Sequence, residues 1–148
     1  MNICFVCTGN ICRSPMAEGI LAKLADESGL DIGALSAGIY AWDGNPASSH
    51  AINAVKALYD VDLSGHEAKS FSSYLADASD LILCMEGHHA QQARSIAPHA
   101  KDKIMTIYEW AYGDAHSGVA DPYGGSYAVY KKCAEEIYTL IKTGLDAM

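Results

Sequence analysis

The chain has 148 residues, half of them hydrophobic, and it carries a formal net charge of −8. This length fits a single domain with a full-sized core, and no linker or repeat divides residues 1–148. The negative charge argues against nucleic acid and against an anionic membrane as main partners. It also means that an anionic ligand has to be captured by local donors against an unfavourable overall field.

Short apolar runs alternate along the chain with stretches of helical periodicity. This alternation predicts crossover connections and therefore a parallel sheet covered by helices. We expect strands near residues 2–6, 33–37, 79–84 and 103–107. We expect helices at residues 15–28, 47–59, 87–96 and 126–144, with a shorter one around 71–76. Ligands of such open sheets bind beyond the carboxyl ends of the strands.

The most informative segment follows the first expected strand and reads Cys7-Thr8-Gly9-Asn10-Ile11-Cys12-Arg13-Ser14. The five residues between Cys7 and Arg13 can fold around a tetrahedral anion with successive backbone N–H groups pointing inward. Arg13 would close this ring, because its planar guanidinium grips two phosphate oxygens at once. Cys7 would then face the phosphorus atom from the floor of the loop.

The start of the next helix adds to the positive field of this loop. Pro15 suits a first helical turn, whose free N–H groups face a bound anion. The same field favours the thiolate form of Cys7, which is the form that attacks phosphorus. Ser14 supplies a hydroxyl that can donate to this thiolate. The segment therefore predicts cleavage of phosphate esters with Cys7 as the nucleophile.

The segment Val6–Glu18 resembles the signature of the low-molecular-weight protein tyrosine phosphatases. A cysteine and an arginine at this spacing also occur by chance, but the thirteen-residue block together with a distant Asp-Pro is specific. The resemblance implies an α/β fold: a single-domain open four-stranded parallel sheet with helices on both faces and a phosphate-binding loop after the first strand. It extends over nearly the whole chain, through Ser36-Ala37-Gly38, Gly44-Asn45-Pro46, His66, Asp80–Met85 and Asp121-Pro122-Tyr123.

The resemblance also implies roles for residues outside the loop. Asp121 is expected to be the general acid that protonates the leaving oxygen and later takes a proton from the attacking water. Asp-Pro alone commonly begins a turn, so this role depends on the loop as well. Ser36 and His66 are expected to support the loop from beneath together with Ser14, and Asn10 to hold its shape from within. His66 could equally be a solvated loop histidine.

The five cysteines, at positions 4, 7, 12, 84 and 133, form no disulfide framework, and the first residues lack a signal-peptide pattern. We therefore expect a cytoplasmic protein. Cys4 continues a strand and is interpreted as core. The resemblance suggests that Cys7 and Cys12 form a disulfide on oxidation, which would block the nucleophile reversibly. His88 and His89 lack ligand spacing with cysteines, so we expect neither a metal nor an organic cofactor.

The substrate slot is the least determined part of the site. Ile11 on the loop, Trp42 after the second strand and Tyr123 beside the acid are candidate walls for an aryl phosphate. Trp42 could instead be an exposed loop aromatic, and Tyr123 could pack on the last helix. The remaining residues expected to bind the phosphoryl group are Thr8, Gly9, Asn10, Cys12 and Ser14.

Two glycines follow Tyr123, where many tyrosine phosphatases carry a second aromatic residue. The order Asp-Pro-aromatic-Gly-Gly, together with Thr8 and the stretch Ala41–Gly44, resembles a bacterial branch of the family more closely. This branch includes protein arginine phosphatases. Arginine-specific members carry threonine where Ile11 stands, whereas Ile11 offers only an apolar, β-branched wall. We therefore expect dephosphorylation of phosphotyrosine in proteins or peptides, with arginine phosphatase as the alternative.

Two other functions are less favoured. Arsenate reduction uses a similar loop but needs a relay of thiols, and no second cysteine follows Cys84 within the next expected helix. A non-catalytic phosphate-binding module would require neither Cys7 nor Asp121. No feature of the sequence indicates an oligomeric state.

Overall fold

The computed structural model describes residues 1–148 and contains four strands: β1 (Asn2–Cys7), β2 (Gly33–Gly38), β3 (Leu81–Cys84) and β4 (Ile104–Thr106). They form one parallel sheet in the order β2-β1-β3-β4, which confirms the expected open sheet. The helices are α1 (Arg13–Glu27), α2 (Ser49–Tyr59), α3 (Ser73–Ala78), α4 (Gly87–Ile96), α5 (Ile107–Tyr112) and α6 (Tyr127–Asp146), with a 3-10 helix η1 (Pro98–Lys103). None of these helices is long and apolar enough to cross a membrane.

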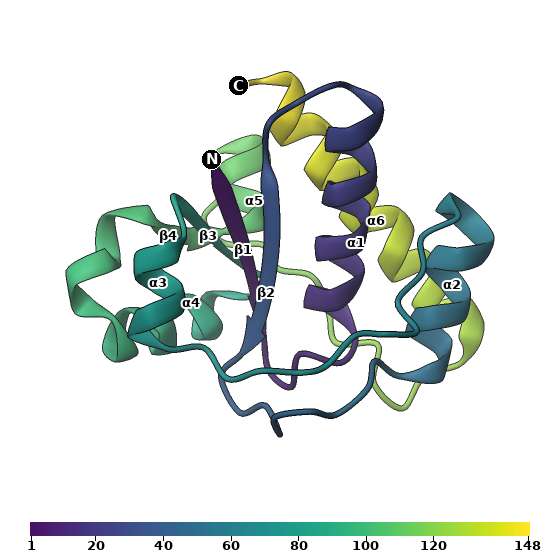
Figure 1. Ribbon diagram of the computed structural model, residues 1–148. Helices are drawn as coiled ribbons and strands as arrows, with labels where there is room; N and C mark the ends of the chain where they lie inside the picture. The colour runs from purple at the N-terminus through teal and green to yellow at the C-terminus, as the bar shows by residue number, and fades with distance from the viewer.

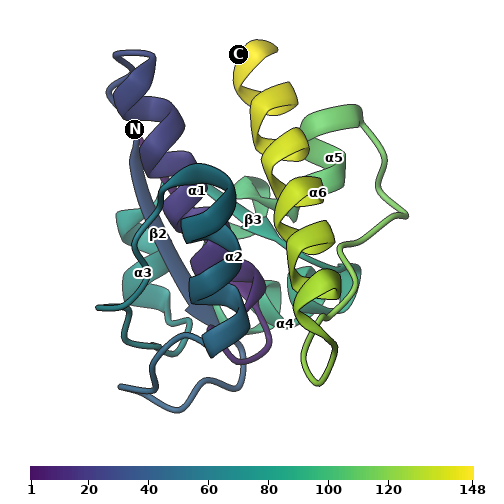
Figure 2. The same ribbon diagram turned by 90° about the vertical axis from the view of Figure 1, so that its right-hand side faces the viewer.

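The helices cover both faces of the sheet (Figure 1). On one face, Ile3, Phe5 and Leu83 pack into a core built with α1, α2 and α6, which lie side by side in Figure 2. On the other face, Cys4 and Val6 join a smaller core with α3, α4 and η1. Successive strand residues point to opposite faces, so β1, which is covered on both, is a nearly continuous apolar run.

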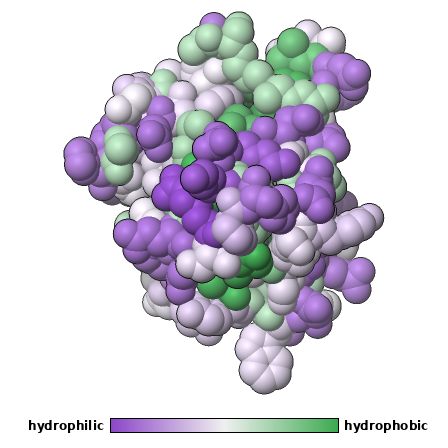
Figure 3. All heavy atoms as spheres, turned by 90° about the vertical axis from the view of Figure 1, so that its left-hand side faces the viewer, coloured by the Kyte–Doolittle hydropathy of each residue, from purple (hydrophilic) through white to green (hydrophobic).

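The layer of α3, α4 and η1 presents its polar side to the outside. Ala90 and Ala93 of α4 are buried against the sheet. Gln91, which lies between them in the sequence, and Arg94, which follows them, are exposed. Figure 3 shows hydrophilic side chains spread over the middle of this face. This one-sided burial is the pattern of a surface helix on an open sheet.

The carboxyl ends of the strands meet at one edge of the sheet, at the bottom of Figure 1. There Cys7 pairs in register with Gly38, Val6 with Cys84, and Cys84 with Thr106. The strand order reverses at β1, because β2 lies on one side of it and β3 on the other. This switch point is where open α/β sheets bind ligands, and the loop after β1 lies there.

The structure corrects the prediction around the fourth strand. The expected strand at 103–107 is shorter, because η1 extends to Lys103 and Ile107 already begins α5. The side chain of Thr106 caps α5 by accepting a hydrogen bond from the backbone N–H of Glu109 at 3.1 Å, and Gly113 ends it with a φ of 71°. Thr106, Glu109 and Gly113 are typical of the start and end of a short helix. The apolar residues between them favoured a strand in the sequence analysis, so this helix was missed.

Candidate active site

The loop between β1 and α1 is organised around Asn10, which is fully buried and has a positive φ of 56°. Asparagine tolerates this left-handed conformation better than most residues. Its side-chain amide donates to Ser14 Oγ at 2.8 Å and to Ser36 Oγ at 2.9 Å, and its Oδ1 accepts from the Lys69 backbone N–H at 3.0 Å. Ser36 donates in turn to Glu18. These contacts fix the loop from within.

His66 and Gly38 hold the same loop from outside. The Nε2 of His66 lies 2.8 Å from the carbonyl oxygen of Asn10, so this histidine is not a free solvated side chain. A Cβ on Gly38 would lie 2.6 Å from the Thr8 carbonyl oxygen and 2.9 Å from the Asn10 nitrogen. The end of β2 therefore approaches the loop backbone at a distance that only glycine allows.

Replacement of Gly38 by alanine is expected to lower kcat/KM by about 100-fold, because the added Cβ displaces the loop backbone and with it the bound phosphoryl group. Gly33→Ala, at the other end of β2, is the matched control. The one atom that a Cβ there would clash with is the side-chain Oδ1 of Asn2, which can rotate away, and no backbone atom lies closer than 4.0 Å. Steady-state hydrolysis of an aryl phosphate checks both variants. Equal losses in the two variants would show that the close approach at Gly38 is not the cause.

Cys7 is the last residue of β1 and is only 3 % exposed. Its Sγ lies 2.9 Å from the Oγ of Ser14. A thiolate can only accept, so Ser14 is the donor when Cys7 is ionised. Helix α1 begins at Arg13, two residues earlier than expected, which places Ser14 in its first turn. The positive end of α1 is therefore directed at the loop.

Arg13 is 2 % exposed and is held in place by its terminal nitrogens. Nη1 donates to Glu86 Oε2 at 2.5 Å and to the Val119 carbonyl at 2.7 Å, while Nη2 lies 3.6 Å from Asp121 Oδ2. The Nε of Arg13 is buried without a hydrogen-bond partner in the protein. A buried donor of this kind costs about 1–3 kcal/mol unless an acceptor reaches it. An oxyanion in the loop would supply that acceptor.

Glu86 is ionised in this arrangement. Its partial burial opposes the charged form, but the hydrogen bond and charge of Arg13, with a contribution from His88, outweigh it and hold the pKa of Glu86 below its usual range. The ion pair therefore fixes the guanidinium while leaving its Nε side unpaired. Glu86 lies two residues after the end of β3, at the carboxyl edge of the sheet.

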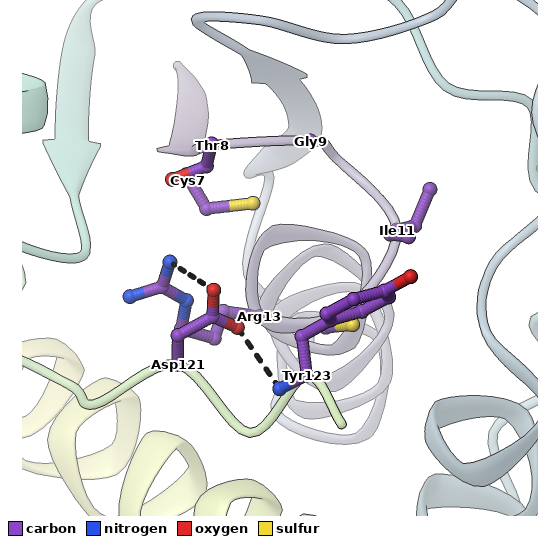
Figure 4. A pocket seen from close by; sticks show the side chains of 8 residues that line it. Cys7, Thr8, Gly9, Ile11, Arg13, Asp121 and Tyr123 are labelled. Atoms are coloured by element: carbon purple, nitrogen blue, oxygen red, sulfur yellow. Dashed lines mark hydrogen bonds and ion pairs between the residues drawn. The ribbon is translucent and has the colours of Figure 1, made fainter. Parts of the chain in front are cut away.

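A cavity of about 210 Å³ opens above Cys7 (Figure 4). The Sγ of Cys7 and the carboxylate of Asp121 point into the same space from opposite sides, with Ile11 and Tyr123 along its border. Asp121 is half exposed, and its Oδ1 accepts a hydrogen bond from the backbone N–H of Tyr123 at 3.0 Å. The full lining is Cys7, Thr8, Gly9, Ile11, Cys12, Arg13, Asp121 and Tyr123.

Trp42 and Cys12 differ in how far they take part in this site. Trp42 is 80 % exposed and is not among the residues that line the cavity, so its role as a wall stays a prediction. Cys12 lines the cavity as a free thiol, with its Sγ 3.4 Å from both Ser48 Oγ and Tyr130 OH. Burial raises the pKa of Cys12. The disulfide with Cys7 also stays a prediction.

Sequence reasoning missed the residues that position this site from a distance. Glu86 and Val119 orient Arg13, and His89 contacts Thr8. Glu86 could have been noticed, because a polar residue two positions after a buried strand lies at the ligand edge of the sheet, and His89 follows it in the first turn of α4. Val119 carries no such signal, since only its backbone carbonyl is used.

Glu86, His88 and His89 place ligand-type atoms within 4.8 Å of one another. The Glu86 carboxylate is paired with Arg13, however, and both ring nitrogens of His89 are engaged in hydrogen bonds. These three residues therefore have no free set of donor atoms with which to hold a metal ion.

A buried cysteine and an anchored arginine lie at the two ends of one loop, at the switch point of an open parallel sheet. This arrangement places the protein among the cysteine-dependent phosphatases. Residues 2–147 match the family described as low molecular weight phosphotyrosine protein phosphatase. The chain belongs to this family, and the resemblance found in the sequence is confirmed.

The relatives of this chain are named for two different substrates, phosphotyrosine and phosphoarginine in proteins. A protein-arginine-phosphatase of Bacillus subtilis (strain 168) is 37% identical over 143 residues, which cover 96% of this chain and 93% of the relative. A low molecular weight protein tyrosine phosphatase from T. tengcongensis has a solved structure with 43% identity and a TM-score of 0.95, covering 100% of this chain and 99% of that one. A cysteine-to-serine mutant of YwlE arginine phosphatase, with a phosphorylated active site serine, has 35% identity and a TM-score of 0.95, covering 99% and 95%.

Proposed function

We propose that this protein removes phosphate from phosphotyrosine in proteins through a phosphocysteine intermediate on Cys7. The cavity carries this proposal, because Cys7 faces Asp121 across a space bordered by Ile11 and Tyr123. An apolar β-branched side chain and an aromatic ring suit a flat phenyl group. The polar guanidinium of phosphoarginine would find no partner on Ile11.

In the first step, the thiolate of Cys7 attacks phosphorus and the P–S bond forms as the P–O bond to the phenol breaks. Arg13, through its unpaired Nε, and the N–H groups of the loop hold the equatorial oxygens. Asp121 gives its proton to the leaving phenolate oxygen. Ser14, 2.9 Å from the sulfur, stabilises the attacking thiolate by donating to it.

In the second step, water attacks the phosphocysteine from the side that the phenol has left. Asp121, now a carboxylate, accepts a proton from this water, and the P–S bond breaks to regenerate the thiolate of Cys7. The phosphorylated active site serine of the YwlE mutant supports a covalent intermediate of this type, since that serine replaces a cysteine. No step requires a metal ion or an organic cofactor.

Protein arginine phosphatase is the second candidate. The identity to the B. subtilis protein-arginine-phosphatase, over nearly the full length of both chains, favours it. Arsenate reduction has less support, because a thiol relay would need cysteines at the site besides Cys7 and Cys12 of the loop. Cys84 and Cys133 are both buried and neither lines the cavity.

Phosphate release from a phosphotyrosine peptide and a phosphoarginine peptide, measured side by side with Cys7→Ser as the blank, tests the proposal. Cys7-dependent release mainly from phosphotyrosine is the expected result. Preference for phosphoarginine would replace the substrate while keeping the mechanism. Binding of either peptide without any release would point to a phosphate-binding module instead.

Ile11→Thr is expected to shift the ratio of the two kcat/KM values toward phosphoarginine by about tenfold, because the hydroxyl offers a polar partner to a guanidinium and removes part of the apolar wall. Ile96→Thr makes the same replacement at a partly exposed position at the end of α4 and should leave the ratio unchanged. An unchanged ratio in Ile11→Thr would remove Ile11 as the determinant of the substrate.

A further inference from the structure

His89 is a buried titratable residue that the proposed reaction does not use. It lies in the first turn of α4 and is fully shielded from solvent. Its Nδ1 lies 3.2 Å from the backbone nitrogen of Glu86, and its Nε2 lies 2.8 Å from Thr8 Oγ1. The imidazole thus connects the segment after β3 with the residue that follows Cys7.

These contacts determine where the protons of His89 and Thr8 lie. The backbone N–H of Glu86 can only donate, so Nδ1 of His89 is an acceptor and carries no proton. Burial, aided by the charges of His88 and Arg13, lowers the pKa of His89 to about 4, so the ring is neutral at pH 7. A neutral ring with an unprotonated Nδ1 has its proton on Nε2. Nε2 therefore donates to Thr8 Oγ1.

The oxygen of Thr8 consequently accepts from His89, and its own O–H proton is free for a different acceptor. Thr8 lines the cavity together with Cys7, Arg13 and Asp121. We propose that His89 is a positioning residue that turns the hydroxyl proton of Thr8 toward an oxygen of the phosphoryl group bound in this cavity. The inference rests on the proposed phosphatase function and adds an oriented side-chain donor to Arg13 and the loop N–H groups.

Two replacements of Thr8 test whether its hydroxyl binds the phosphoryl group. Thr8→Val keeps the shape and removes the donor, whereas Thr8→Ser keeps the donor. Inorganic phosphate is the probe, measured as a competitive inhibitor of p-nitrophenyl phosphate hydrolysis. We expect phosphate to bind about 10- to 100-fold more weakly to Thr8→Val, since the lost bond is to a charged group, and with near wild-type affinity to Thr8→Ser.

Replacements of His89 test whether it acts through Thr8. His89→Leu removes the donor and should weaken phosphate binding by about three- to tenfold, because the Thr8 hydroxyl is still present but no longer oriented. His89→Gln, which offers an N–H near the position of Nε2, should recover most of this loss. In a Thr8→Val background, His89→Leu should change phosphate affinity no further, because the hydroxyl that it orients is gone.

The thermal unfolding midpoint is measured for every variant. If the role of His89 were purely structural, His89→Leu would lower this midpoint equally in the wild-type and Thr8→Val backgrounds, and its effect on phosphate affinity would not depend on Thr8. Thr139→Val and His99→Gln make matched replacements at exposed positions and should leave phosphate affinity unchanged. Wild-type phosphate affinity in Thr8→Val, or equal effects of His89→Leu in both backgrounds, would overturn the inference. The proposed function fails separately, if the wild-type protein shows no Cys7-dependent hydrolysis.

Discussion

Arg13→Lys is expected to lower kcat/KM by about 1000-fold, although the positive charge is kept. Arginine in this site performs two tasks at once. Its Nη1 is committed to Glu86 and Val119, and its Nε is left to reach a phosphoryl oxygen. Lysine has a single ammonium at the end of a flexible stem, so it can satisfy the buried acceptors or the phosphoryl group but cannot present a planar fork to both.

The measurement is kcat and KM for a phosphotyrosine peptide, with the unfolding midpoint recorded for the same preparation. Arg94→Lys is the matched control, because Arg94 also donates to a backbone carbonyl, from Nη2 to the Ile104 oxygen at 2.9 Å, but it is exposed and lies outside the cavity. Its activity should stay near that of the wild type. Near-normal turnover of Arg13→Lys in a folded protein would contradict the role assigned to the guanidinium.

The strands and long helices of this protein were predictable because each is visible in the local pattern of residues. β1 is buried on both faces and reads as an apolar run, and α6 has the periodicity of a helix with one buried face. The strand expected at 103–107 is present as β4, but the prediction missed η1 before it and α5 after it, which join β4 without an intervening loop. There the apolar residues of a strand and a helix merge into one run, and only the caps separate them.

The active site divides in the same way between local and distant information. Cys7, Asn10, Arg13 and Ser14 lie in one continuous segment, so their partnership was visible in the spacing. Glu86, by contrast, is joined to Arg13 only because β3 pairs with β1 and ends beside the loop. That neighbour relation depends on strand order, which residue spacing alone does not contain.

Asp121→Asn is expected to lower kcat for a phosphotyrosine peptide by about 100- to 10 000-fold, the usual contribution of a general acid. Asparagine keeps an oxygen to accept the hydrogen bond from the Tyr123 backbone N–H, so the loop around residue 121 should keep its conformation. What is lost is the proton for the phenolate oxygen in the first step and the proton acceptor for water in the second. With p-nitrophenyl phosphate, whose leaving group departs without a proton, the first step should stay fast.

Rapid-mixing kinetics separate these two losses. Asp121→Asn should release about one equivalent of p-nitrophenol per site in a fast burst and then turn over slowly, because phosphocysteine accumulates when no carboxylate activates water. Asp114→Asn is a close control, since Asp114 also accepts backbone N–H bonds, from His116 and Ser117, in the same connection between α5 and α6. It should behave like the wild type. Slow release of p-nitrophenol without a burst in Asp121→Asn would mean that Asp121 orients the substrate rather than transfers the proton.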